Sequence, residues 1–281
     1  MYSAISPWAV GIKAATLDEA IEAARAGGFD GVEIDARQIV DLPAGEAAQR
    51  IAGAGLRAAG FALPMDFRGE QDAFDSQIRT LPGLVRAAAD AGARRCFTWI
   101  MPCCDQRAMA ENWRFHVERL CPIAGILAAF DCRLGLEFIG PVTLRKSRKF
   151  PFIFTMRQML DLAADVGENV GLLVDSFHWY TSRGTLDDLR RLKAEQVVYV
   201  HVNDAPAGVA IDEQLDNVRD LPGATGMIDM GDFLGALAEI QYDGPVVPEP
   251  FSRRLNEMAS DRERARIAGE AMRKVFSLAG L

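Results

Sequence analysis

Two short apolar runs in the second half of the chain show the pattern on which the fold prediction rests. The first run reads V-G-L-L-V-D from Val170, and the second reads V-V-Y-V-H-V-N-D and ends at Asp204, with a polar segment of helical character between them. A nearly continuous Val/Leu run of strand length is typical of a strand buried on both faces, as in parallel sheets that helices cover. Strand, helix, strand is therefore predicted from Val170 to Asp204.

The same alternation is visible from the N-terminus onward. Thr16 and Glu19 have the spacing of a capping box, and the helix that begins there is predicted to stop at Gly27 and Gly28. A strand follows at residues 31–35, and a weaker strand, interrupted by Pro7, precedes the helix at residues 4–11. Further strands are predicted at residues 56–63, 95–101, 133–139 and 245–249, and further helices at residues 45–54, 73–91, 107–130, 155–166, 232–240 and 253–277.

Eight strand–helix pairs in 281 residues fit the usual size of one (β/α)8 barrel. Strict alternation implies a parallel sheet with right-handed crossovers, and eight such units can close on themselves. We therefore predict a single domain, residues 1–281, with the α/β fold of a TIM barrel. Two connections, residues 140–154 and 205–230, are longer than usual and follow strands at the expected active face, so we interpret them as lid or specificity loops.

Composition narrows the classes of partner. The chain has 31 basic and 39 acidic residues and a net charge of −8, which repels a nucleic-acid backbone. No apolar run is long enough to cross a bilayer, and the N-terminus lacks the pattern of a signal peptide, so we expect a cytoplasmic protein that binds neither nucleic acid nor membrane. The five cysteines contain no C-x-x-C pair and are interpreted as reduced, mostly buried thiols. A homo-oligomer stays open.

Four successive strand ends carry a side chain that can bind a metal ion. They are Glu137, Asp175, His201 and Glu249. Neighbouring strand ends of a barrel point into one cavity, where three carboxylates and one imidazole form a mostly oxygen shell. Each acidic residue alone is more simply explained as a solvated loop residue or an ion-pair partner, but four at equivalent positions favour a metal site. We expect a divalent metal, Mn²⁺ first, with Mg²⁺, Co²⁺ or Zn²⁺ as alternatives.

These residues lie in motifs that resemble a known family. The motifs are L-E-F-I-G at Leu136, V-G-L-L-V-D-S-F-H at Val170, H-V-N-D-A-P at His201, D-x-x-R-D-L-P-G from Asp216, and the strand ending at Glu249. Together they resemble the sugar phosphate isomerase/epimerase superfamily of xylose isomerase-like TIM barrels, and within it the 2-keto-myo-inositol (inosose) isomerase group. Before Arg133 the resemblance is one of architecture only.

The resemblance implies roles for these positions. Glu137, Asp175, His201 and Glu249 would hold the divalent metal, and Glu137 and Glu249 would also be the catalytic acid/base pair. His178 and Arg219 would bind oxygen atoms of a small sugar or cyclitol substrate. The implied activity is that of a metal-dependent isomerase or epimerase acting on a keto-sugar or keto-inositol.

The expected proton-transfer reaction also follows from the chemistry of these residues, without the family resemblance. Removal of a proton next to a carbonyl group creates an enediolate, whose charge a metal stabilises, and a second carboxylate can return the proton elsewhere. Trp99 and Trp179 lie near predicted strand ends and are expected to wall the substrate pocket, as is Trp8. No Gly-rich phosphate loop follows the last strands, so we expect an unphosphorylated substrate.

Two features depart from the family pattern. The turn that the family writes as P-G-x-G-x-I-D reads P-G-A-T-G-M-I-D here, with one extra residue after Arg219, and Pro248 and Pro250 flank Glu249. The first feature affects where the Arg219 side chain lies, and the second affects how far the Glu249 carboxylate reaches.

Three other functions compete with this interpretation. A metal-dependent dehydratase, or a lyase that eliminates from a 3-keto-glycoside, begins with the same proton abstraction. A non-catalytic barrel that keeps its metal for binding is the second alternative. A DNA-repair endonuclease of the same superfamily is disfavoured, because it needs more histidines than the three present and a surface that attracts DNA.

Overall fold

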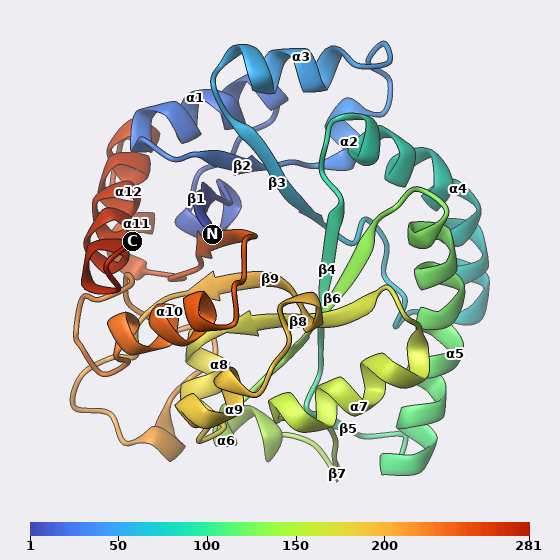
Figure 1. Ribbon diagram of the computed structural model, residues 1–281. Helices are drawn as coiled ribbons and strands as arrows, with labels where there is room; N and C mark the ends of the chain where they lie inside the picture. The colour runs from blue at the N-terminus through green and yellow to red at the C-terminus, as the bar shows by residue number, and fades with distance from the viewer.

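Eight parallel strands close into a barrel in the order β1-β10-β9-β8-β6-β4-β3-β2, as the computed structural model of residues 1–281 shows (Figure 1). Every neighbouring pair around the barrel is parallel. The predicted TIM barrel is therefore confirmed. The strands are β1 (Tyr2–Ile5), β2 (Gly31–Glu33), β3 (Arg57–Ala62), β4 (Arg95–Ile100), β6 (Arg133–Phe138), β8 (Val170–Asp175), β9 (Val197–Val202) and β10 (Pro245–Pro248).

Helices surround the barrel on the outside, and the main apolar core of 67 buried residues lies largely between the two layers (Figure 1). None of these helices combines the length and the hydropathy needed to cross a membrane. The longer helices are α1 (Leu17–Gly27), α3 (Glu46–Gly53), α4 (Gln71–Asp90), α5 (Met109–Ala128), α7 (Met156–Val166), α10 (Met230–Glu239) and α12 (Asp261–Leu278). The short helices are α2 (Ala36–Ile39), α6 (Val142–Arg145), α8 (Ser176–Thr181), α9 (Leu186–Arg190) and α11 (Arg253–Asn256).

The caps predicted for α1 are present. The Thr16 hydroxyl accepts a hydrogen bond from the Glu19 backbone N–H at 3.2 Å, and the helix ends at Gly28 with a φ of 71°, a left-handed conformation that glycine adopts without strain. The Glu19 carboxylate accepts from the backbone N–H of Ala15 instead of Thr16, at 2.6 Å, so the box is closed one residue earlier than expected.

Three predicted elements have different bounds. The first strand, expected at residues 4–11, ends at Ile5, because Pro7 lacks a backbone N–H and starts the 3₁₀ turn Trp8–Val10. The segment between β8 and β9 forms two helices, α8 and α9, so His178 lies on a helical turn and not in a loop. The last helix is interrupted, because Ser260 caps a new helix by accepting from the Glu263 backbone N–H.

The inside of the barrel is built in layers. A small separate cluster fills its middle, and its buried members are Ala4, Ala59, Leu173, Tyr199 and Val247. Side chains two residues apart on a strand point to the same side, so the next inward positions along β8 and β9 are Asp175 and His201. The middle layer therefore forms a buried, mostly apolar floor beneath the carboxyl ends of the strands.

The two long connections have structure of their own. Residues 140–154 contain α6 and the short strand β7 (Phe150–Pro151), which pairs antiparallel with β5 (Cys103–Cys104). In residues 205–230, Asp204 and Asp220 form an isolated bridge. The Asp204 carboxylate accepts four backbone N–H groups, from Ala205, Thr225, Gly226 and Ile228, at 2.8–3.0 Å. One buried side chain thus anchors the longer loop, and its function as a lid stays a prediction.

We expect Asp204→Ala to lower the free energy of unfolding by about 2–4 kcal/mol, because it leaves buried backbone donors without an acceptor. Asp220→Ala is the matched control, since its carboxylate receives no hydrogen bond, and it should change stability by less than about 0.5 kcal/mol. Urea unfolding of both variants measures the difference. Equal stability of the two would show that the carboxylate does not anchor the loop.

Candidate active site

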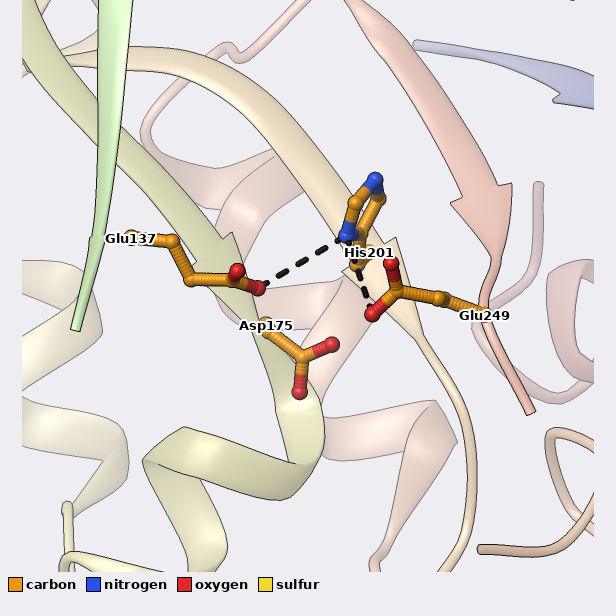
Figure 2. Close-up of side chains that lie close together, drawn as sticks. All are labelled: Glu137, Asp175, His201 and Glu249. Atoms are coloured by element: carbon orange, nitrogen blue, oxygen red, sulfur yellow. Dashed lines mark ion pairs between the residues drawn. The ribbon is translucent and has the colours of Figure 1, made fainter. Parts of the chain in front are cut away.

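Four side chains from adjacent strands converge at the carboxyl end of the barrel. Glu137 lies near the end of β6, Asp175 ends β8, His201 lies near the end of β9, and Glu249 follows β10 directly. One ligand atom from each lies within 4.8 Å of the others (Figure 2). The structure therefore brings together the four residues that the strand ends predicted.

The cluster leaves polar atoms without protein partners. His201 Nδ1 lies 3.7 Å from Glu137 Oε1 and 3.4 Å from Glu249 Oε2 (Figure 2), and neither contact has the geometry of a hydrogen bond. Both nitrogens of His201 and Oε1 of Glu137 are buried without any hydrogen bond. Unpaired buried polar atoms are rare in folded proteins, and here His201 Nδ1 and Glu137 Oε1 face each other across the cluster (Figure 2). This donor set fits a divalent cation.

Burial and mutual repulsion disturb the titration of these groups. Burial raises the pKa of Glu137 to about 8 and raises the pKa of Asp175 above its usual range. Burial also disfavours charged His201, but the carboxylates of Glu249 and Glu137 outweigh it and raise its pKa well above the usual value. For Glu249, burial would raise the pKa, yet His201 and Arg219 lower it. Protons thus compensate for a surplus of negative charge that a cation can neutralise instead.

Hydrogen bonds from outside the cluster orient Asp175. Its Oδ1 accepts from the backbone N–H groups of Phe177 and His178 at 2.7 and 3.1 Å, which caps α8. Its Oδ2 accepts from the Asn203 amide at 2.9 Å and from Arg219 Nη1 at 3.1 Å. Ligands held in this way keep one orientation, as is usual around bound metals.

Arg219 and His178, the predicted substrate residues, lie beside the cluster. Arg219 is 4% exposed; its Nη1 donates to Glu249 Oε2 at 3.0 Å and its Nη2 donates to Asp216 Oδ1 at 3.0 Å. The same Nη2 lies 3.1 Å from Nε2 of His178, which is fully buried. Burial first, and then the Arg219 charge, hold the pKa of His178 well below its usual value, so its imidazole is neutral. The extra residue in the following turn does not keep Arg219 from the site.

A cavity of about 480 Å³ opens above the cluster, a size suited to a small ligand. Trp99 lines it and is 45% exposed, with the Arg68 guanidinium 4.0 Å from its ring centroid. Trp179 does not line it. Its indole N–H donates to the Thr185 carbonyl at 3.2 Å, and its ring packs against Phe233, because α8 turns it toward α10 and away from the strand ends.

Glu33 also lines this cavity, and the strand-end argument above did not include it. It is the last residue of β2; its Oε1 accepts from the Ser6 hydroxyl at 3.1 Å and its Oε2 from the Tyr199 hydroxyl at 3.3 Å. Burial raises the pKa of Glu33 to about 7, against the opposing effect of the His201 charge. The sequence predicted a strand at residues 31–35, so Glu33 was expected inside the strand; only the structure, where β2 ends at Glu33, places it at a strand end.

A family model described as the xylose isomerase-like TIM barrel matches residues 21–277, which is most of the chain. The chain belongs to this family. The family predicted from the sequence motifs is thus confirmed, and the buried Glu/Asp/His/Glu cluster is the metal site of this xylose isomerase-like barrel.

Two relatives illustrate the chemistry found among similar sequences. The inosose isomerase of Bacillus licheniformis is 28% identical over 178 residues, covering 62% of this chain and 59% of the relative. The 3-dehydroshikimate dehydratase of Pseudomonas aeruginosa is 27% identical over 254 residues, covering 84% of this chain and 36% of the relative. The matched part of the chain thus spans about three fifths of the first relative and a third of the second.

Two solved structures have the same fold. A xylose isomerase domain protein from Alicyclobacillus acidocaldarius superposes with a TM-score of 0.87 at 29% identity, over all of both chains. The IOLI protein with a bound zinc atom superposes with a TM-score of 0.79 at 20% identity, over 99% of this chain and 98% of that one. Zinc is therefore found in a barrel of this shape, while the donor set here points to a divalent metal without selecting one.

We expect added Mn²⁺ or Zn²⁺ to raise the melting temperature of the metal-depleted protein by about 5–10 °C at concentrations near a hundred times the dissociation constant. Glu137→Gln and His201→Ala should lose most of this shift, since each removes a ligand. Glu33→Gln, at a strand end outside the cluster, is the matched control and should keep it. Differential scanning calorimetry with and without metal makes the comparison. An equal shift in all variants would place metal binding elsewhere.

The raised pKa of Glu33 predicts a pH-dependent effect on stability. Since its pKa of about 7 exceeds the ordinary value of 4.5, the folded protein keeps a proton that the unfolded chain releases between these values. Stability is therefore lost as the pH rises from 4.5 through 7, by roughly 3 kcal/mol in total. Glu33→Gln should be more stable than the parent at pH 8 by an amount that vanishes at pH 4. Urea unfolding of metal-depleted protein tests this, with Glu22→Gln, at an exposed position of α1 outside the cavity, as the control.

Proposed function

We propose that this protein is a divalent-metal-dependent isomerase or epimerase that acts on a small keto-sugar or keto-inositol by proton transfer through an enediolate. The observation that carries the proposal is the pair of carboxylates, Glu137 and Glu249, which reach the same point from strands on either side of β8 and β9 (Figure 2). The inosose isomerases among the similar sequences support the same reaction class.

Glu137 and Glu249 would act as the acid/base pair. One carboxylate takes the proton from the carbon next to the carbonyl group, and the other returns a proton to the neighbouring carbon or the opposite face. A divalent cation held by Glu137, Asp175, His201 and Glu249 would polarise the carbonyl group and stabilise the developing negative charge. The carbon atom, and the face of it, to which the proton returns then decides between isomerisation and epimerisation.

Arg219 and His178 would hold the oxygen atoms of the substrate. Ion pairs with Asp175, Asp216 and Glu249 fix the Arg219 guanidinium at the edge of the cavity in which the substrate would lie. The neutral His178 ring lies directly beside it. The exposed face of Trp99 offers an apolar surface to the carbon side of a sugar ring, and Trp179 has no part in the proposal because it faces the core.

Mn²⁺ is the metal that we propose, with Mg²⁺, Co²⁺ or Zn²⁺ as alternatives. Three carboxylates and one imidazole supply mostly hard oxygen donors, which suit Mn²⁺ better than a thiolate-rich set would. The acidic chain and the absence of a phosphate-binding loop in the sequence support an unphosphorylated substrate.

A metal-dependent dehydratase is the second candidate. The 3-dehydroshikimate dehydratases align over 84% of this chain, a longer stretch than the inosose isomerases do. Dehydration starts with the same removal of a proton beside a carbonyl group and differs only in the group that leaves next. The product therefore separates the two candidates.

We expect the Mn²⁺-loaded protein to incorporate deuterium from D₂O into an inosose or keto-sugar without loss of water, as followed by NMR and mass spectrometry. Glu137→Gln and Glu249→Gln should each slow the exchange by about 10²- to 10⁴-fold, because each lacks a carboxylate that would serve as proton-transfer group and as metal ligand. Exposed Glu239→Gln on α10 should exchange like the parent protein. An ultraviolet-absorbing enone product would favour the dehydratase, and undiminished exchange in both Gln variants would refute the acid/base assignment.

A further inference from the structure

The cavity above the Glu/Asp/His/Glu cluster continues into a side lobe. This lobe has a volume of about 460 Å³ and shares Ser6, Trp8, Glu33 and Ala62 with the main cavity. Its outer wall carries polar and charged side chains, among them Lys13 and Gln38. A substrate bound at the cluster would thus have its far side facing Glu33, where the two spaces join.

Glu33 differs from the other acidic residues of the site because no cation pairs with it. Its carboxylate is in no ion pair with any Lys, Arg or His of the chain, and its two protein donors are the neutral hydroxyl groups of Ser6 and Tyr199. A carboxylate accepts about four hydrogen bonds in all, so roughly half of this capacity remains for a ligand. The side chain is only partly buried and lines both lobes, so that capacity is open to the cavity.

The barrel floor is shaped to hold this carboxylate in place. Tyr199 lies two residues before His201 on β9 and reaches across the barrel to Glu33. Gly60 on β3 makes room for it, because a Cβ there would lie 2.6 Å from the Tyr199 ring. On the other side, Ser6 follows the end of β1 and donates to the second oxygen.

A purely structural role does not explain this arrangement. A partly buried acid with no counter-ion destabilises the fold, and burial raises its pKa to about 7. A glutamine or an apolar side chain would fill the same space without that penalty. Groups that are unfavourable for stability and face a cavity are characteristic of functional sites.

We propose that Glu33, held by Ser6 and Tyr199, is a substrate-binding residue. It would accept hydrogen bonds from the hydroxyl groups of the substrate that face away from the Glu/Asp/His/Glu cluster. It would thereby select polyhydroxylated ketones by the configuration of carbons remote from the reacting one. This inference rests on the proposed function, because it takes the substrate to be a polyol ketone bound at the cluster.

The test compares Glu33→Gln with Glu22→Gln, which removes the same charge from an exposed residue of α1 that lines neither lobe. In the Mn²⁺-loaded protein, Glu33→Gln should raise KM for deuterium exchange of an inosose roughly ten- to a hundredfold, with kcat changed only a few-fold. Glu22→Gln should leave both constants within about twofold, and the metal-induced rise in melting temperature should persist in both variants.

Inososes that lack a single remote hydroxyl group provide the sharper measurement. One of them should lose affinity for the parent protein by the same factor as Glu33→Gln does, and the variant should not discriminate further against it. If Glu33→Gln binds and exchanges the full inosose like the parent, or discriminates against every deoxy compound as the parent does, the inference is wrong.

Calorimetric titration of the inosose separates this result from a failure of the proposed function. Binding that depends on Glu33 but is not followed by deuterium exchange in the parent protein would refute the isomerase proposal and support the role of Glu33. Deuterium exchange that does not depend on Glu33 would support the isomerase proposal and refute the role of Glu33. No binding of any inosose by the parent protein would overturn both.

Discussion

The concentration of negative charge at the carboxyl end of the barrel is the constraint on which the site depends. Three carboxylates and one imidazole lie within 4.8 Å of one another, and Arg219 is the one permanent cation bonded to them. Like charges this close raise each other's proton affinity when they are withdrawn from water. Protons balance part of this charge, and a divalent cation bound by the four residues would replace them. Metal affinity, proton affinity and fold stability are thus linked through the same four side chains.

The barrel geometry creates this concentration at the carboxyl ends of four neighbouring strands. Leu173 and Tyr199 belong to the middle layer, and two residues further along the same strands are Asp175 and His201. Because side chains alternate along a strand, the layer directly above this buried, mostly apolar floor can be polar. The Tyr199 hydroxyl also connects the floor to Glu33 on the opposite wall. The cavity therefore has a charged metal side and a second acidic side, with space for a small polar molecule between them.

The longest loop is part of the site because of one anchor. The Asp204 carboxylate gathers backbone N–H groups from both ends of residues 205–230, and its own backbone pairs with Asp220, the neighbour of Arg219. This contact brings Arg219 against Asp175 and Glu249 although it comes from an irregular segment. Catalytic loops on a rigid barrel need such fixed points, since the loop itself has few regular backbone hydrogen bonds.

The barrel and the four side chains that meet at its carboxyl end could both be predicted from the sequence, because both follow from local patterns. Apolar runs of strand length mark β8 and β9, and an acidic or imidazole group at the end of each strand reaches the site wherever eight such units close. Only the tertiary structure decided the direction of Trp179, which depends on the rotation of α8 against α10, and the contact of Glu33 with Tyr199 from a strand 166 residues away. Such contacts join segments that share no local pattern, so spacing along the chain does not encode them.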